Sequence, residues 1–337
     1  MIIQRYYETW YSLKEKVVDF RGKFMKYYYR VYGLNIESTI EIPEFEVIDD
    51  ISKYSIDVNL TYGTVNSEIK DLIERRHFSN FKKMNMWFYI KEVGIFHIFN
   101  GDTVIIEPCK DADLNMVKIY IMGSVLGMVL LQKNIVAIHG GGIVIDGKGC
   151  IFTGQKGAGK STITTALRKK GYKFIADDVC SINIGETNTI HHGFGYQKLC
   201  EDAMEKLGYN LDEFEPFRGD LNVNKYIVPA FDEFTKEEVP LEAVFELVVG
   251  DVDEVKIEEI LGANKMNKLI ENVFRIDMLT YAGGMEPKYF KQCLDIAKST
   301  KMYRITRPKD VFSVEDQISL VREVLLLDEE DDLGKII

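Results

Sequence analysis

The spacing of apolar residues divides the chain into a first part rich in β-strand signals and a second part where strands and helices alternate. Between about residues 25 and 110, short runs rich in tyrosine, valine and isoleucine are separated by turn sequences such as Asn100-Gly101, a pattern typical of strands joined by hairpins. We expect strands at 25–38, 54–61, 86–93, 94–99 and 103–107. Residues 1–25 carry aromatic side chains at a spacing that predicts an amphipathic helix.

Residues 114–133 are apolar around most of a helical surface, which predicts a buried helix. The uncharged part of this run, 119–132, is too short to span a bilayer. The pattern that follows predicts strands at 139–145, 149–153, 173–176, 179–184, 223–229, 241–249, 255–260 and 302–306. Helices are expected at 161–170, 199–207, 265–279, 287–299 and 314–326.

This order predicts an α/β protein with a small, mostly β N-terminal lobe. The lobe is expected at 26–112, after an N-terminal helical extension at 1–25. The α/β domain should occupy 113–327, and an acidic, solvated tail should follow at 328–337.

The composition limits the classes of binding partner and the cellular compartment that we expect for this protein. The formal net charge of −11 argues against nucleic acid and against anionic membrane, both of which attract positive surfaces. The five cysteines are scattered and form no C-x-x-C pair, which argues against a disulfide framework or a zinc site. The charged N-terminus does not resemble a signal peptide, so we expect a cytoplasmic protein.

Residues 154–161 match the phosphate-binding pattern G-x-x-x-x-G-K-[ST] between a predicted strand and a predicted helix. Glycines let the backbone curl so that successive N–H groups face phosphate oxygens, and the helix start adds its own free N–H groups. Lys160 would bind the β- and γ-phosphates, and the Ser161 hydroxyl would bind Mg²⁺. We therefore expect ATP and Mg²⁺ as cofactors, with the phosphates held by Gly154, Lys156, Gly157, Ala158, Gly159, Lys160, Ser161 and Thr162.

Asp177 and Asp178 follow the predicted strand 173–176, and ligands of α/β sheets gather at the carboxyl ends of strands. We assign Asp177 as the general base and Asp178 as a metal ligand together with Ser161, with the exchange of these two roles left open. A turn or helix-cap role for the pair is the alternative.

His139 either packs at the start of its strand or lies close to bound phosphate or to Asp177, where it would tune that carboxyl's pKa. A further cation for the transferred phosphoryl group could come from Lys156, Arg218, Lys225 or Arg275, each of which could instead be a surface charge.

Together, His139-Gly140, the phosphate loop and the segment 173–178 resemble the catalytic domain of HPr kinase/phosphorylase. The resemblance implies a P-loop kinase core of the HPr-kinase/PEP-carboxykinase type, and ATP-dependent phosphorylation of a serine hydroxyl on a peptide or protein. It also implies a catalytic set of His139, Lys160, Ser161, Asp177 and Asp178. That family is typically hexameric, which leaves a homo-oligomer open.

Thr162 stands where the family usually has glutamate, Lys156 stands where it usually has serine, and the HPr-recognition signature is not apparent beyond residue 185. Segments 29–38, 193–199 and 302–308 are more similar to HPr-kinase-related enzymes of peptide-tailoring clusters, including those that phosphorylate lasso-peptide precursors.

Three functions remain open at this point. The first is a serine kinase for a peptide or small protein, such as a ribosomal peptide precursor. The second is a dedicated HPr serine kinase/phosphorylase, and the third is a nucleotide-binding sensor without transfer activity. A GTPase is disfavoured, because Asn264-Lys265-Met266-Asn267 lacks the guanine-reading aspartate.

Overall fold

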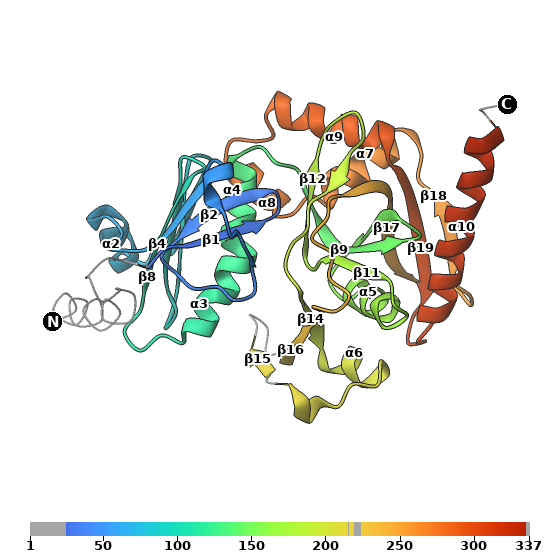
Figure 1. Cartoon of the computed structure of the whole chain (residues 1–337), viewed down its shortest axis with the longest axis horizontal. Coiled ribbons are helices and arrows are strands. Elements are labelled where there is room, and N and C mark those ends of the chain that lie inside the picture. The colour runs from blue at the N-terminus through green and yellow to red at the C-terminus, as the bar shows by residue number, and fades with distance from the viewer. Residues whose placement is uncertain (1–24, 215, 219–223, 335–337) are drawn as a thin grey trace. The chain divides into compact units, whose positions relative to one another are not determined.

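The computed structural model describes residues 25–214, 216–218 and 224–334, and it contains helices and several sheets, as the α/β class requires (Figure 1). The chain divides into two compact units. The described part of the first comprises residues 25–136 with Arg275–Tyr289, and the second comprises Ala137–Phe274 with the chain from Phe290 onward. The helix expected at 1–25 lies outside the described residues.

An eight-stranded sheet forms the first unit, in the order β3-β1-β2-β4-β8-β7-β6-β5. Where one strand was expected at 25–38, two strands form a hairpin, because Tyr32 and Gly33 adopt the positive φ angles, 55° and 76°, of a two-residue hairpin turn. The strands are β1 (Tyr27–Val31), β2 (Leu34–Ser38), β3 (Glu46–Val47), β4 (Val58–Tyr62), β5 (Ser79–Lys82), β6 (Asn85–Ile90), β7 (Gly94–Phe99) and β8 (Thr103–Pro108).

The apolar run after this sheet forms α3 (Leu114–Tyr120), a π-helical turn η2 (Ile121–Val125) and α4 (Leu126–Gln132), which lie along the sheet in Figure 1. The Tyr120 ring lies 5.5 Å from that of Phe96, and the Gln132 amide donates to the Ile98 carbonyl at 3.0 Å. The run 114–132 is long and apolar enough to cross a membrane, with a mean hydropathy of 1.8, and 56% of its most apolar 18-residue window is buried in the structure. These contacts identify it as a core helix of the first unit, so the compact units do not follow the boundary expected at 112/113.

Three shorter elements complete the first unit: η1 (Ile51–Lys53), α2 (Ser67–Glu74) and α8 (Ile276–Tyr281). The sequence pattern gave no signal for α2. The Asn66 side chain caps it by accepting the Ile69 N–H at 2.9 Å, and Ile69 packs in a cluster with Trp87 and Ile95.

The sheet of the second unit is also eight-stranded, with β10, β17 and β19 parallel and β9 antiparallel to β10. Phe152, Phe245 and Tyr303 stand side by side on these three parallel strands and stack at 5.2 and 5.5 Å. The helices α5 (Lys160–Lys169) and α10 (Val314–Gly334) contribute to the same core. The strands are β9 (Ala137–Ile145), β10 (Lys148–Gly154), β11 (Lys173–Ala176), β12 (Val179–Asn183), β13 (Thr189–Ile190), β17 (Val239–Gly250), β18 (Lys256–Glu259) and β19 (Lys301–Pro308).

A small three-stranded sheet in the order β14-β16-β15 lies beside α5 (Figure 1). Its strands are β14 (Tyr196–Cys200), β16 (Asn224–Pro229) and β15 (Pro216–Arg218). The remaining elements are α6 (Glu201–Lys206), η3 (Leu211–Glu213), α7 (Gly262–Glu271) and α9 (Pro287–Ser299).

Three expected helices differ from the structure. The helix expected at 199–207 begins only at Glu201, because Leu199 and Cys200 pair with β16. The helix expected at 265–279 is interrupted before α8, where Arg275 has a φ of +58°. The backbone of α10 continues to Gly334 through most of the segment expected to be a tail, since no glycine or proline interrupts it earlier.

Candidate functional site

The phosphate-loop motif joins β10 directly to α5 within the second unit. Gly154 ends β10 with a φ of +132°, and a Cβ there would lie 2.4 Å from the Leu247 carbonyl oxygen of β17. Gly159 precedes α5 with a φ of +111°. Both backbone angles are ones that side chains rarely permit, so these two glycines are needed for the loop to leave one element and enter the next.

Lys160 bridges this loop from the first turn of α5. Its ammonium donates to the Gly154 carbonyl at 2.7 Å and to the Gln155 carbonyl at 3.3 Å. Burial lowers the pKa of Lys160, and the nearby charges of Asp178 and Asp177 raise it. The lysine therefore lies within electrostatic range of the acidic pair.

Arg307, on β19, supports the loop from another part of the chain. Its Nε donates to the Ala158 carbonyl at 2.9 Å, and its Nη2 donates to the Gly157 carbonyl at 3.2 Å. The sequence analysis gave Arg307 no role, although it lies in one of the segments noted for family likeness. Arg307 is far from the loop in sequence, so no local sequence pattern could have predicted this contact.

The acidic pair follows β11, and the two side chains have different surroundings. Asp177 is 4% exposed and accepts the main-chain N–H of Lys198 at Oδ2, at 3.0 Å. Asp178, with a left-handed φ of +60°, has a side chain that is 34% exposed. Its Oδ2 accepts from the Lys198 ammonium at 3.2 Å.

These surroundings separate the acidities of the two carboxyls. Burial and the neighbouring charge of Asp178 raise the pKa of Asp177. Burial alone would also raise the pKa of Asp178. The charges of Lys198, His139 and Lys225 outweigh burial there, so the pKa of Asp178 is lowered well below the usual range of an aspartate.

His139 is exposed on β9, opposite Val179 of β12. The next residue, Gly140, donates its N–H to the Asp178 carbonyl at 3.2 Å. The charge of His139 is one of those that lower the pKa of Asp178. The glycines after His139 have a packing role as well: a Cβ on Gly141 would lie 2.8 Å from the Thr164 methyl of α5.

The expected additional cations divide between the two units. Lys225, on β16, lies close enough to lower the pKa of both aspartates. Lys156 is exposed on the loop, and its charge acts on Cys200. Arg275 belongs to the first unit and donates to Ser124 there at 2.7 Å, so the structure does not join it to the loop within the second unit. The side chain of Arg218 lies outside the described residues.

A buried network fixes β14 to α5. The Gln197 amide accepts from Thr165 at 3.0 Å and from Arg168 Nε at 3.1 Å, and it donates to Thr164 at 2.8 Å. Arg168 also donates to the Tyr209 hydroxyl at 2.8 Å. The helix that follows the loop is thereby tied to the strand whose next residue, Lys198, contacts both acids. This network was not expected from the sequence.

The side chains in the site suit a magnesium nucleotide by their chemistry. A hydroxyl, from Ser161, and carboxylates, from the acidic pair, are hard oxygen donors of the kind Mg²⁺ takes. Among the described residues, no group of three or more acidic, histidine or cysteine side chains could hold a metal without help.

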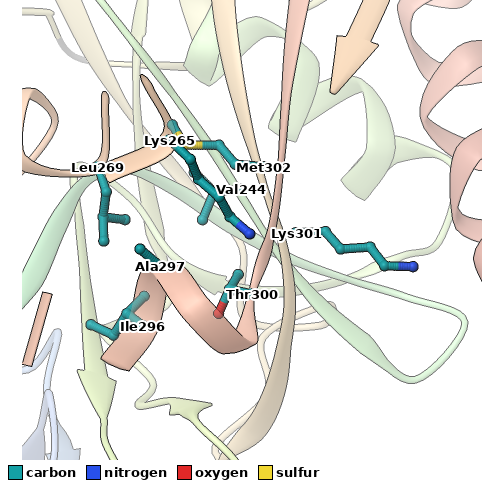
Figure 2. Close-up of a pocket in the computed structure, with 8 residues that line it drawn as sticks. All are labelled: Val244, Lys265, Leu269, Ile296, Ala297, Thr300, Lys301 and Met302. Carbon is teal, nitrogen blue, oxygen red and sulfur yellow. The ribbon is translucent and has the colours of Figure 1, made fainter. Parts of the chain in front are cut away.

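A separate small hollow lies between β17, β19, α7 and α9 of the second unit (Figure 2). Leu269 and Ile296 line it with hydrocarbon, and the buried Thr300 hydroxyl there has no hydrogen-bond partner among the described residues. None of the residues of the loop or of the acidic pair lines it. The hollow therefore plays no part in the candidate site.

No protein-family model matches the chain, and no curated protein matches it. Among solved structures, it is similar to the HPr(Ser) kinase/phosphatase from Coxiella burnetii, with 14% identity and a TM-score of 0.31. That match covers 59% of this chain and 95% of the other.

Proposed function

We propose that the second unit is an ATP-dependent kinase with a P-loop core, which transfers the γ-phosphoryl group to a serine hydroxyl of a peptide or small protein, such as a ribosomal peptide precursor. One observation carries the proposal. The loop lysine, Lys160, and the acidic pair, Asp177 and Asp178, lie within electrostatic range of one another inside one unit. Phosphoryl transfer needs little beyond such positioning and charge neutralisation.

In this proposal the loop binds the phosphates and α5 presents the metal ligand. The main-chain N–H groups of 155–161 and the Lys160 ammonium bind the phosphate oxygens. The bound nucleotide supplies the phosphoryl group, and Mg²⁺ is held by Ser161 and Asp178. Arg307 keeps the loop in shape by holding two of its carbonyls.

The unequal acidities of the two aspartates support their different roles. A carboxyl whose pKa is raised toward neutrality, as at Asp177, is suited to accept the proton of the acceptor hydroxyl. A carboxyl whose pKa is lowered, as at Asp178, is ionised over the physiological range and is suited to bind a cation. Lys225 lies near both and can offset the charge of the transferred phosphoryl group.

The choice of a serine acceptor rests on the resemblance of His139-Gly140, the loop and the segment 173–178 to the HPr kinase catalytic domain. The departures at Lys156 and Thr162 and the missing HPr-recognition signature favour a different peptide or small protein as the acceptor. We propose a cytoplasmic location because the cysteines are scattered and the N-terminus is charged.

The test is transfer from γ-labelled ATP, with Mg²⁺, to synthetic peptides encoded beside the gene, with HPr as a parallel acceptor. We expect phosphoserine on such a peptide by mass spectrometry, and loss of ATP turnover in Lys160→Ala. Asp177→Asn should keep nucleotide affinity and lose transfer by about 100-fold or more, the usual size of a general-base contribution.

Three results would contradict parts of this proposal. Phosphorylation of HPr alone would favour the dedicated HPr kinase. Binding of Mg-ATP without any phosphorylated product would favour the sensor. Transfer by Asp177→Asn at the wild-type rate would remove the general-base assignment.

A further inference from the structure

We propose that Lys198 is a positioning residue for the acidic pair, which orients Asp178 for a divalent cation through its side chain and Asp177 through its main chain. The inference rests on the proposed function, because it takes Asp178 as the metal ligand. It adds a residue and a strand to which the sequence analysis gave no role in the reaction.

The contacts of Lys198 reach both acids through different atoms. Its main-chain N–H donates to Asp177 Oδ2 at 3.0 Å, and its ammonium donates to Asp178 Oδ2 at 3.2 Å. The lysine side chain is 13% exposed and that of Asp178 is 34% exposed, so this ion pair is partly removed from solvent. One residue thus holds both carboxylates at a set distance from each other.

The strand that carries Lys198 is itself held on two sides. β14 is the end strand of its sheet, with Lys198 opposite Ile227 of β16, so N–H groups on its outer edge need partners from elsewhere. Asp177 provides one such partner. The preceding residue, Gln197, is bonded to three side chains of α5, the helix that begins at the loop. Lys198 is therefore placed relative to the loop as well as to the acids.

A different role would give the same contacts. The ammonium could occupy the position of the metal and be displaced when the metal binds. In that case removing the ammonium would strengthen metal binding, because a competing cation is lost. A positioning role predicts the opposite, because carboxylate ligands depend on hydrogen-bonding partners for their orientation, and loss of such a partner typically weakens metal binding by about 10–100-fold.

We favour positioning because both partners of the ion pair are held in place. The Gln197 side chain is bonded to α5, the Lys198 main chain is bonded to Asp177, and Asp178 has a left-handed backbone. A lysine that gives way to a metal needs room to move, and its low exposure leaves little. The hydrogen bond to Oδ2 also leaves the carboxylate's other oxygen to serve as a metal ligand.

The test compares Lys198→Met with wild type and Lys198→Arg. Methionine removes the ammonium but keeps the length of the stem and the main-chain N–H to Asp177. The readout is Mn²⁺ binding, by electron paramagnetic resonance, in the presence of a non-hydrolysable ATP analogue. We expect the Mn²⁺ Kd to rise about 10–100-fold in Lys198→Met, with most of the loss restored in Lys198→Arg.

Kinetics give a second readout. The Mg²⁺ concentration for half-maximal transfer should rise in Lys198→Met, while the KM for the acceptor peptide stays unchanged. Lys206→Met is the matched control, since Lys206 is exposed on α6, close in sequence to β14. It should bind Mn²⁺ like wild type. If Lys198→Met does not fold, Lys198→Leu, which also lacks a donor, takes its place in both readouts.

The outcomes separate the two proposals. If wild type binds the Mn²⁺–nucleotide complex and Lys198→Met binds it equally or more tightly, the positioning role is wrong and the proposed function stands. If wild type does not bind the complex, both are wrong.

Discussion

At the scale of single residues, two adjacent aspartates lie in different surroundings. Asp177 is buried against a main-chain donor, and Asp178 is surrounded by Lys198, His139 and Lys225. Pairs of acids whose surroundings separate their pKa values are typical of sites where one acid accepts a proton and the other stays ionised. The difference comes from strands far apart in sequence.

Burying Asp177 also has a consequence for stability in the absence of metal. Its pKa in the folded protein is raised to about 7, above the ordinary aspartate value of 3.8, so the folded state holds a proton that the unfolded state has released. Its contribution to stability therefore falls as pH rises from about 4 to about 7. An asparagine at this position has no such proton to lose. Metal-free Asp177→Asn should have a higher Tm than wild type at pH 8, and that advantage should shrink toward pH 5.

The measurement is thermal unfolding in EDTA at pH 5 and pH 8, where each kcal/mol corresponds to about 2–4 °C for a protein of this size. Asp232→Asn, at an exposed position, serves as the control and should follow wild type at both pH values. A Tm difference between Asp177→Asn and wild type that does not change with pH would contradict the expectation.

At the scale of elements, two glycines with similar backbone angles allow a test that separates backbone strain from ligand binding. Gly157 has a φ of +84°, and Gly171, after α5, has a φ of +93°. A Cβ at either position would meet no other atom within 4 Å. Alanine should therefore cost about 1–2 kcal/mol of stability at both positions, through backbone strain alone.

Only Gly157→Ala should weaken nucleotide binding, because its methyl group would project from the loop that we propose to bind phosphate. We expect its Kd for a fluorescent ATP analogue to rise at least about tenfold, while Gly171→Ala keeps the wild-type value. Equal affinities in the two variants would mean that the loop does not bind phosphate as proposed.

The link between β14 and α5 depends on one buried amide. Gln197→Leu would leave the buried Arg168 Nε without its partner, whereas the Thr164 and Thr165 hydroxyls would keep the Lys160 and Ser161 carbonyls as acceptors. A buried polar group left unpaired costs about 1–3 kcal/mol, so we expect a loss of that size in urea unfolding. Thr165→Val removes only one of these hydrogen bonds and should cost less. A Gln197→Leu variant as stable as Thr165→Val would show that the network contributes little.

At the scale of the whole molecule, each unit contains chain segments that are distant in sequence. All the site residues assembled here belong to the second unit, while Arg275–Tyr289 belongs to the first. Binding of Mg-ATP should therefore slow amide hydrogen exchange at 155–161, 177–178 and 198. The sheet of β1 to β8 in the first unit should keep its exchange rates.

The experiment is hydrogen-exchange mass spectrometry with and without Mg-ATP, repeated in EDTA. Removing the metal should abolish protection at 177–178 and leave part of the protection in the loop, because the main-chain contacts to phosphate do not need the metal. Protection confined to the first unit would contradict the site.

Much of the local structure could be predicted from sequence. The strand, the glycine loop and the helix around Lys160 formed as expected, because glycine positions and apolar spacing act over a few residues. The hairpin at Tyr32-Gly33, the capped helix α2 and the continuation of α10 differed from expectation. In the first two cases a turn and a cap contact decided the outcome, and apolar periodicity does not report such contacts. The helix α10 continues because no glycine or proline interrupts it before Gly334.

The sequence by itself determined where a phosphate loop could form and which acids could serve it, since the motif is contiguous and its backbone requirements are local. Only the tertiary structure decided that Lys198 would touch both aspartates, that Arg307 would hold the loop and that His139 would act on Asp178. The physical reason is that charges and hydrogen bonds depend on distance in space. Asp177 and Lys198 are 21 positions apart in the sequence, and Ala158 and Arg307 are 149 positions apart. Each pair meets only because strands pair and helices pack.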